Sequence, residues 1–527
     1  MPYDREADKL STSSVTSQRS YSVGIMISRI FRKLRSRKAD DRAIYNLLGN
    51  EEEYLEKEEH EEVEGNTLSF RPVPSTAHNT RHKRLSFLRG LGLLKILLPS
   101  FICATSTPSA LHRQRPTAWL DGLRGVAAVF VVLHHMSLIW FSWDIHNGWN
   151  TWNDHFIQLP IIRLSISGPA NVMLFFVISG YALSWKPLNL IQINEHTKMY
   201  QGLASSIFRR HSRLFLPAVI ICSPAPIIAY HGGYSGEGMP GAAIRPMNPP
   251  RLDNVWEQLG HYVVSIMPLS DLYGPGLIAW VYSDALWTLP IEFKSSLVVF
   301  SLLLALSKCT IRSRVLITLC VAFYSFWYFH WGELLFVGGM LVVEVNLWFQ
   351  RSETRNKLAL DEEEARFALK RRSLYSTGGR TRVCHGTCCT AAFLIGLFVL
   401  SMPEHNRRVS DSYGFETLTE LIPTRFYSSG AADYFWQPLA AIFIVFVIDR
   451  AQFLQAIFTT RLAQYLGRVS FSLYLVHMLI LHSLGFWLGK YFLQIIGSNS
   501  PWKYGTSIGL SAVVVGTVHG VGLREVV

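Results

Sequence analysis

The apolar stretch Trp119–Phe141 constrains the fold of this chain more than any other part of the sequence. It is long enough to cross a bilayer, because about 20 apolar residues in a helix span the hydrocarbon core. It nevertheless carries four ionisable side chains, Asp121, Arg124, His134 and His135. Ionisable groups inside a spanning helix are costly and are rarely kept without a role. We therefore expect this helix to be both a membrane span and part of a functional site.

Helix geometry places three of these side chains along one stripe. At about 100° per residue, position i+11 returns to within about 20° of position i and lies about 16 Å further along the axis. Arg124 and His135 are eleven residues apart, so they share a face. Asp121 lies about 40° from that line, whereas His134 points about 80° away from Arg124. The stripe therefore has a cation at one end and an imidazole at the other.

Two interpretations of this stripe remain open. In the functional one, Arg124 anchors an anionic group and His135 acts as a general base on a hydroxyl. Their separation is comparable to an extended pantetheine arm, so one acyl-CoA could run between them. In the structural one, Arg124 pairs with Asp121 at i, i+3, and His135 is a hydrogen-bonded histidine of the core. Three ionisable positions on one stripe favour the functional interpretation.

The composition places the chain among multi-pass membrane proteins. Its 527 residues are 49% hydrophobic and only 17% charged, and long apolar runs recur along it. The net charge of +12 does not indicate a partner made of nucleic acid, because the excess Lys and Arg lie between the apolar runs, as orientation signals do. The seven cysteines are scattered, so no disulfide framework is predicted.

We expect an all-α polytopic membrane protein, a bundle of about ten transmembrane helices within residues 117–527. The candidate spans lie near residues 119–141, 166–185, 212–230, 280–306, 314–329, 331–349, 385–402, 433–449, 463–487 and 504–522. Residues 1–90 are polar and charge-rich, which predicts a disordered tail. Residues 91–116 contain an apolar run too short to span, which predicts an interfacial or re-entrant segment. The sequence shows no internal repeat, which counts against the commonest transporter architectures.

The basic residues between the spans predict the orientation of the chain. One set of loops carries a clear excess of Lys and Arg, whereas the opposite loops are poor in both, so both termini are predicted to be cytosolic. The Gly- and Pro-rich loop 231–279 is predicted to be a lid outside the membrane rather than a span. The sequence does not choose between the endoplasmic reticulum and the plasma membrane.

Three further segments carry candidate site residues. Arg210 and Arg213 share a helix face and could pair with phosphates, although a membrane-edge cluster is equally consistent with them. Glu292 stands near the outer start of an apolar run, where a carboxylate needs a partner, and a histidine from another helix would serve. Tyr474 and His477 are i, i+3 and face the same way, with Ser470 a turn further back.

A cysteine cluster superficially resembles a metal site: Cys384, His385, Cys388 and Cys389. It opens an apolar helix, and no second ligand pair stands elsewhere in the sequence, so we predict no metal. Lipid-modified or plain buried thiols fit this position better.

Five blocks, taken together and in order, resemble the acyltransferase 3 family of integral membrane acyltransferases, particularly its fungal members. The blocks read WLDGLRGVAAVFVVLHH, NVMLFFVISGYALSWKP, FRRHSRLFLP, LWTLPIEF and VSFSLYLVH, and they cover roughly residues 117–485. The resemblance implies a bundle of about ten helices that moves an acyl group, most commonly acetyl, from acyl-CoA to a hydroxyl or less often an amine.

The resemblance also carries the family's site residues onto this chain. The residues expected to act in catalysis are His135, Glu292 and His477. The residues expected to bind the acyl-CoA donor are Arg124, Arg210 and Arg213. Two departures stand out. Met173 occupies a position where many bacterial members have an Asp, so no carboxylate role transfers there. The chain ends at GLREVV soon after its last apolar run, so we expect its final helix to be incomplete.

These residues lead to a mechanistic hypothesis. Acyl-CoA binds from the cytosol with its phosphates on the three arginines, and His135 removes a proton from the acceptor hydroxyl. Glu292 orients His135 or binds the acceptor, which could be a small molecule, a glycan or a lipid.

Two other classes of protein remain open from the sequence. One is a proton-coupled transporter with a relay of His135, Glu292 and His477. The other is a non-catalytic membrane scaffold in which the tail is the working part.

Overall fold

The computed structural model describes most of the predicted membrane domain. The described residues are 115–151, 154–234, 238–239, 241–245, 247–271, 280–367, 378–404, 412–497 and 499–526. The predicted tail and nearly all of the predicted interfacial segment lie outside them. The chain divides into two units, and the described part of the smaller one is the stretch 347–367 at the end of helix α11. Everything below concerns the larger unit unless stated.

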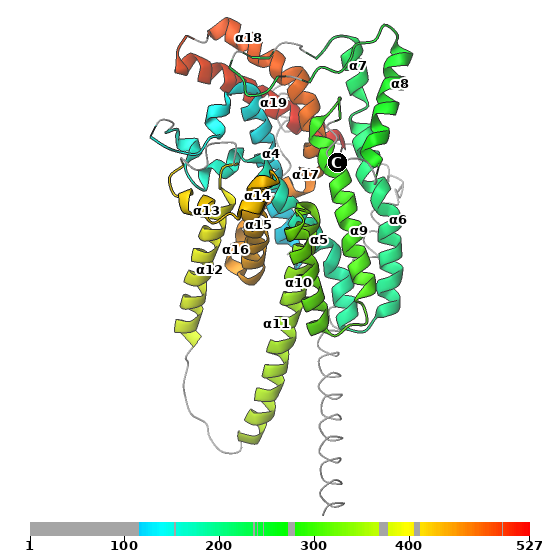
Figure 1. Cartoon of the computed structure of the whole chain (residues 1–527), viewed down its shortest axis with the longest axis vertical. Coiled ribbons are helices and arrows are strands. Elements are labelled where there is room, and N and C mark those ends of the chain that lie inside the picture. Colours follow the sequence, from blue (N-terminus) through cyan, green and yellow to red (C-terminus); the bar gives the residue numbers. More distant parts are fainter. Residues whose placement is uncertain are drawn as a thin grey trace, which may run out of the picture. The chain divides into compact units, whose positions relative to one another are not determined.

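Within the described residues the protein is all-helical, with no strand beyond one isolated bridge, which confirms the predicted fold class. The main helices are α4 (Ala118–Trp140), α5 (Gly168–Gln192), α6 (His196–Ile221), α7 (Pro224–Tyr230), α8 (Val255–Ile266), α9 (Thr288–Ala305), α10 (Ile311–Trp327), α11 (Trp331–Phe367), α12 (Gly378–Leu400), α15 (Asp433–Arg450), α16 (Gln452–Phe458), α17 (Arg461–Ile480), α18 (Phe486–Ile496) and α19 (Pro501–Val526) (Figure 1).

The predicted count of about ten spans is not confirmed. By length and hydropathy, six stretches of the described chain can cross a membrane: Ala118–Trp140, Gly168–Gln192, His196–Tyr230, Asp284–Ala305, Trp331–Ser352 and Arg461–Ile496. Helices α15 and α16, bent by 106° at their junction, make a seventh if they count as one span. Helix α10 has 17 residues and the apolar part of α12 is Gly386–Leu400. Both are short for the roughly 20 residues that a span needs.

Two helices extend beyond their predicted limits. Helix α6 begins at His196, well before the predicted start of a span at residue 212. Its polar first half buries Met199 and Leu203 at i, i+4, which is a helical pattern that a search for apolar runs passes over. Helix α11 continues to Phe367, past the predicted end of its span at residue 349.

Helices α4 and α17 lie side by side and pack backbone against backbone (Figure 1). A Cβ atom on Gly125 would stand 2.4 Å from the backbone nitrogen of Gly467. One on Gly467 would stand 2.4 Å from the backbone oxygen of Asp121. Small residues allow this close approach between membrane helices. The two polar stripes predicted on these helices are therefore pressed together.

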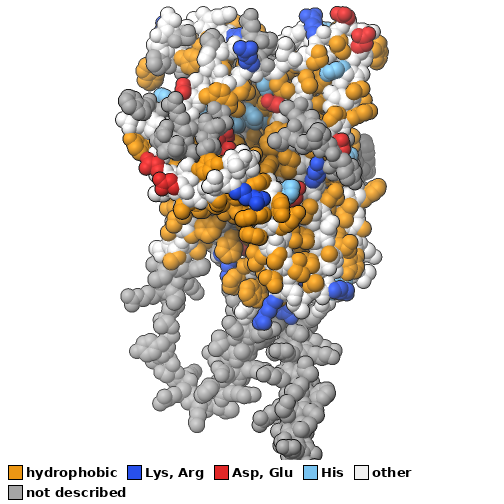
Figure 2. All heavy atoms as spheres, viewed as in Figure 1, with side chains coloured by type: hydrophobic (Ala, Val, Ile, Leu, Met, Phe, Trp, Pro, Cys, Tyr) orange, Lys and Arg blue, Asp and Glu red, His pale blue; other side chains and the backbone are white. Residues whose placement is uncertain are grey.

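Glycines also allow a close backbone approach between α5 and α11. A Cβ on Gly339 would lie 2.2 Å from the backbone oxygen of Val177, and one on Gly180 would lie 2.1 Å from that of Phe336. Apolar side chains on the outer faces of α6 and α10, such as Leu316, remain exposed. Hydrophobic side chains also spread over the face of the molecule in Figure 2. Such a surface is expected of a protein whose solvent is lipid.

The region predicted to be a lid contains no candidate span within its described residues. It holds the short helix α8 and an irregular stretch that closes over one end of α4. Ala243 N donates to Phe141 O at 2.7 Å, and Ile244 N donates to Leu138 O at 3.2 Å. These bonds use carbonyls at the C-terminal end of α4 that have no partner within the helix.

Arg163 holds the neighbouring loops at the same end of α4. Its Nη1 donates to Ser401 O at 2.6 Å and its Nη2 donates to His146 O at 2.9 Å. Burial lowers the pKa of this guanidinium to about 10, because a low-dielectric surrounding disfavours the charged form. Arg163 therefore remains charged near neutral pH and joins three segments that are distant in sequence.

We expect Gly467→Ala to destabilise the protein, because the added methyl meets the backbone of α4. Overpacking of this kind costs about 1–3 kcal/mol, which thermal unfolding of the purified protein measures as a lower Tm. The matched control is Gly202→Ala on α6, where a Cβ meets nothing within 4 Å. Equal Tm values for the two variants would contradict the backbone-to-backbone packing of α4 and α17.

Candidate functional site

Two histidines meet where α4 packs against α17. The ring centroids of His135 and His477 are 5.1 Å apart. His477 has no exposed surface, whereas His135 is half-buried. Of the two imidazoles, only that of His135 is therefore accessible to a small molecule without a change in the structure.

The environment of His477 fixes its tautomer. Its Nδ1 lies 2.6 Å from Tyr474 O, and a carbonyl only accepts hydrogen bonds, so Nδ1 carries the proton. The Nε2 of the neutral ring therefore holds a lone pair. The Tyr474 hydroxyl donates to Ala285 O and also contacts the Thr288 hydroxyl. This network connects α17 to the beginning of α9 and holds His477 in place.

His135 carries a buried ring nitrogen that the protein does not satisfy. Within the described part of the chain its Nδ1 has no hydrogen-bond partner. A buried polar atom without a partner costs free energy, so a native structure that keeps one needs an explanation. A bound substrate hydroxyl would supply the missing partner.

His134 lies beside this pair but has a different environment. Its Nδ1 donates to Ile166 O at 2.7 Å, and its ring packs against the backbone at Gly168, where a Cβ would stand 2.3 Å from the ring. Its centroid is 5.2 Å from those of both His135 and His146. His134 therefore ties α4 to the segment that precedes α5.

The contacts of Arg124 combine both interpretations of the α4 stripe. Its Nη2 lies 3.1 Å from Asp121 Oδ1 and donates to Gly467 O at 3.2 Å, and its Nε donates to Ser470 Oγ at 3.0 Å. The ion pair with Asp121 is thus present, as the structural interpretation expects. These bonds orient the guanidinium, and none of its contacts within the described residues uses Nη1. A fixed guanidinium with an unused donor is suited to an anionic ligand.

The partner of Glu292 is not the predicted histidine. Arg210 Nη2 donates to Glu292 Oε1 at 2.8 Å, and both side chains are largely buried. This bond joins α6 to α9 and engages one of the two arginines predicted to bind phosphate. Arg210 Nε is buried without a partner in the described structure, while Arg213 is exposed.

The sequence reasoning missed three residues near this site. Ser470, which the sequence placed only on the face of Tyr474 and His477, accepts a hydrogen bond from Arg124. His482 and Asp284 approach each other at 3.9 Å, between Nε2 and Oδ1. His482 lies in a π-helical turn, η8 (Leu481–Gly485), for which the sequence gives no signal. Asp284 stands two residues before the block that contains Glu292, which is the one signal that could have identified it.

Two further polar pairs are structural. Arg314 Nε donates to Glu344 Oε1 at 2.8 Å, with both side chains almost fully buried. Tyr181 donates to Asp449 Oδ1 at 2.7 Å and joins α5 to α15. Both pairs satisfy groups that would otherwise be unpaired in a low-dielectric interior.

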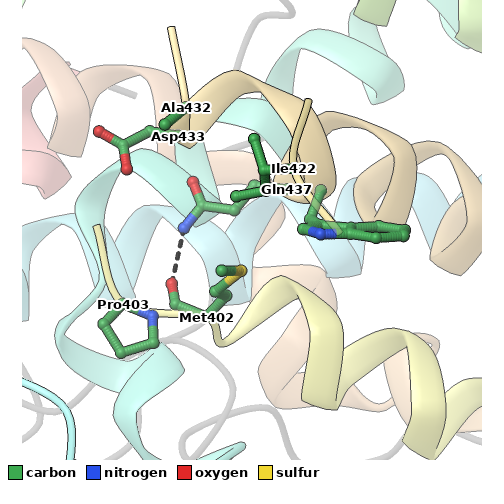
Figure 3. A pocket seen from close by; sticks show the side chains of 7 residues that line it. Met402, Pro403, Ile422, Ala432, Asp433 and Gln437 are labelled. Carbon is green, nitrogen blue, oxygen red and sulfur yellow. Dashed lines mark hydrogen bonds between the residues drawn. The ribbon is translucent and has the colours of Figure 1, made fainter. Parts of the chain in front are cut away.

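The described residues hold a small cavity but no group of side chains that could bind a metal ion. Among the described residues, no three His, Cys, Asp or Glu side chains lie close enough to hold a metal ion. A cavity of about 10 Å³ lies between Met402, Pro403 and the start of α15, where Gln437 Nε2 donates to Met402 O (Figure 3). That volume holds one water at most, so the cavity is too small for a substrate.

Comparison with known proteins defines the class of this molecule. The family model described as "Acyltransferase domain" matches residues 117–521. An O-acetyltransferase, PaAT-1 of Phomopsis amygdali, is 36% identical over 457 residues, which cover 84% of this chain and 87% of that protein. Acyltransferase R4 of a Phoma species is 21% identical over 459 residues, covering 77% of this chain and 92% of its own. Acyltransferase clz18 of Cochliobolus lunatus is 22% identical over 436 residues, which cover 71% of this chain and 86% of that protein.

No solved structure matches the chain. The matches and the apolar helices together define a multi-pass membrane enzyme that transfers acyl groups. The chain belongs to the acyltransferase 3 family, as its five sequence blocks predicted. The transporter alternative finds no support, because the family and these relatives are acyltransferases.

We expect the ion pair between Arg210 and Glu292 to appear as a coupling in a double-mutant cycle. Arg210→Ala and Glu292→Gln each leave a largely buried group without its partner, so each lowers Tm. The double variant loses less than the sum of the two, by about 1 kcal/mol. Thermal unfolding of the four proteins measures this coupling. Strictly additive losses would show that the two side chains do not interact in the membrane.

Proposed function

We propose that this enzyme transfers an acetyl group from acetyl-CoA to a hydroxyl of its acceptor, with His135 as general base. The observation that carries the proposal is the packed pair of His135 and His477, in which His135 Nδ1 is buried without a partner. The relative from Phomopsis amygdali is an O-acetyltransferase, which supports both acetyl as the transferred group and oxygen as its destination.

The arginines support a coenzyme A donor. Arg124 lies about 16 Å from His135 along α4, a length comparable to the pantetheine arm. Its unused Nη1, the buried Nε of Arg210 and the exposed side chain of Arg213 supply donors for phosphate oxygens. We propose that the end of α4 that carries Arg124 lies at the cytosolic face, in keeping with the excess of basic residues in one set of loops.

The reaction balances without a metal. His135 accepts the proton of the acceptor hydroxyl as the oxygen attacks the thioester carbonyl, so a carbon–oxygen bond forms and the carbon–sulfur bond breaks. The proton then returns to the departing thiolate of coenzyme A. The ring of His477, 5.1 Å from that of His135 between centroids, is a polar neighbour of the imidazolium of His135 while it holds the proton.

We expect His135→Ala to lose acetyl transfer by about a hundredfold to ten-thousandfold, the usual contribution of general-base catalysis. Membranes that contain the protein are incubated with radiolabelled acetyl-CoA and a total metabolite and lipid extract, and the labelled product is quantified. His231→Ala is the control, because His231 is exposed at the end of α7. If label enters product equally in wild type and His135→Ala, His135 is not the base.

The donor assignment makes a separate prediction. Acetyl-pantetheine carries the thioester but none of the nucleotide phosphates, so wild type should prefer acetyl-CoA strongly. Arg124→Ala should raise the KM for acetyl-CoA by about tenfold to a hundredfold, the value of a charge-assisted hydrogen bond. The KM for acetyl-pantetheine should not change. Equal effects of Arg124→Ala on both donors would exclude phosphate binding by this residue.

A further inference from the structure

His482 has a fixed tautomer and an unused proton. It lies in the turn η8 and is almost fully buried. Met247 N lies 2.9 Å from its Nδ1, and a backbone amide only donates, so Nδ1 is the acceptor. The neutral ring therefore carries its proton on Nε2, and within the described residues Nε2 has no hydrogen-bond partner.

Asp284 presents the complementary group. Its Oδ1 is buried, has no hydrogen-bond partner in the described structure, and lies 3.9 Å from His482 Nε2. That distance is too long for a direct hydrogen bond. The side chain of Asp284 is nevertheless 33% exposed, so one side of the carboxylate borders accessible space. A donor and an acceptor thus face one another across a gap, and neither is satisfied.

One hydroxyl group would satisfy both atoms, because a hydroxyl both accepts and donates. It would accept from His482 Nε2 and donate to Asp284 Oδ1, at about 2.8 Å from each. A methyl group or a carbonyl satisfies at most one of the two atoms. The chemistry of the gap therefore selects an alcohol.

The gap belongs to the same interior as the histidine pair. His482 follows His477 by five residues, across the junction of α17 and η8. Ala285, the neighbour of Asp284, accepts the hydrogen bond of Tyr474, whose own carbonyl holds His477. Met247 places the irregular stretch of the lid on the far side of His482.

We infer that Asp284 and His482 bind a second hydroxyl of the acceptor, distinct from the hydroxyl that is acetylated. The acceptor class is then a molecule with at least two hydroxyls, and the pair selects among alcohols by that second group. The inference rests on the proposed function, because it takes His135 as the point of reaction.

The experiment compares alcohols that differ only in a second hydroxyl. Acetyl transfer from labelled acetyl-CoA is measured on the membrane-bound full-length protein, with a series of straight-chain α,ω-alkanediols and the monohydric alkanols of the same carbon number. At one chain length, the kcat/KM of the wild type for the diol should exceed that for the matching alkanol by about tenfold or more. The reason is that an alkanol leaves Asp284 and His482 without a hydrogen-bond partner, which is costly. Shorter and longer diols should lose that advantage.

Two variants test the assignment to these residues. His482→Asn puts an amide oxygen where Nδ1 stood, so it can still accept from Met247 N, but it removes the Nε2 donor. Asp284→Ala removes the acceptor. Both should bring the ratio of diol to alkanol close to one. The control is Ser483→Ala, whose hydroxyl is already bonded to Leu479 O, and it should keep the wild-type ratio.

The outcomes separate this inference from the proposed function. A wild type that acetylates diols and alkanols equally, or a ratio that survives both variants, overturns the inference and leaves acetyl transfer standing. In that case the gap holds a structural water. A wild type that acetylates no alcohol while acetylating an amine overturns the hydroxyl acceptor itself, and the inference falls with it.

Discussion

The close packing of α4 against α17 is the constraint on which the rest of the site depends. Glycines on both helices remove the side chains that would hold the backbones apart. As a result Arg124 reaches Ser470 and the backbone of α17, and the ring of His135 reaches that of His477. The contacts of Arg124 and the packing of the two histidines therefore depend on the same close approach of α4 and α17.

The polar groups in this interior fall into two kinds. Pairs such as Arg314 with Glu344 are satisfied by each other and hold helices together. His135, Asp284 and His482 each keep a buried atom that no described residue satisfies. Because unsatisfied buried atoms are costly, we propose that a bound substrate supplies the missing partners. The satisfied pairs supply the rigidity that such a site needs.

The sequence predicted the parts of the site that depend on a single helix. The spacing of Arg124 and His135 selected His135 over His134, because regular geometry determines which residues share a face. It did not predict the partner of Glu292, because the choice between Arg210 and a histidine depends on how α6 and α9 pack. It gave His482 no role in the site, and a π-helical turn there interrupts the regular rotation. The count of about ten spans is not confirmed, because within the described residues some apolar helices, such as α10, are short for a span.

The central claim is that the imidazole of His135 transfers a proton, and chemical rescue tests it most directly. His135→Gly opens a cavity that can admit a free imidazole. Acetyl transfer by this variant is measured with a series of substituted imidazoles of increasing basicity, and with thiazole, which fills similar space but is a much weaker base. The account predicts that rescue rises with the basicity of the imidazole and is absent with thiazole. Equal rescue by thiazole and imidazole would show that His135 only fills space, and would contradict its role as the base.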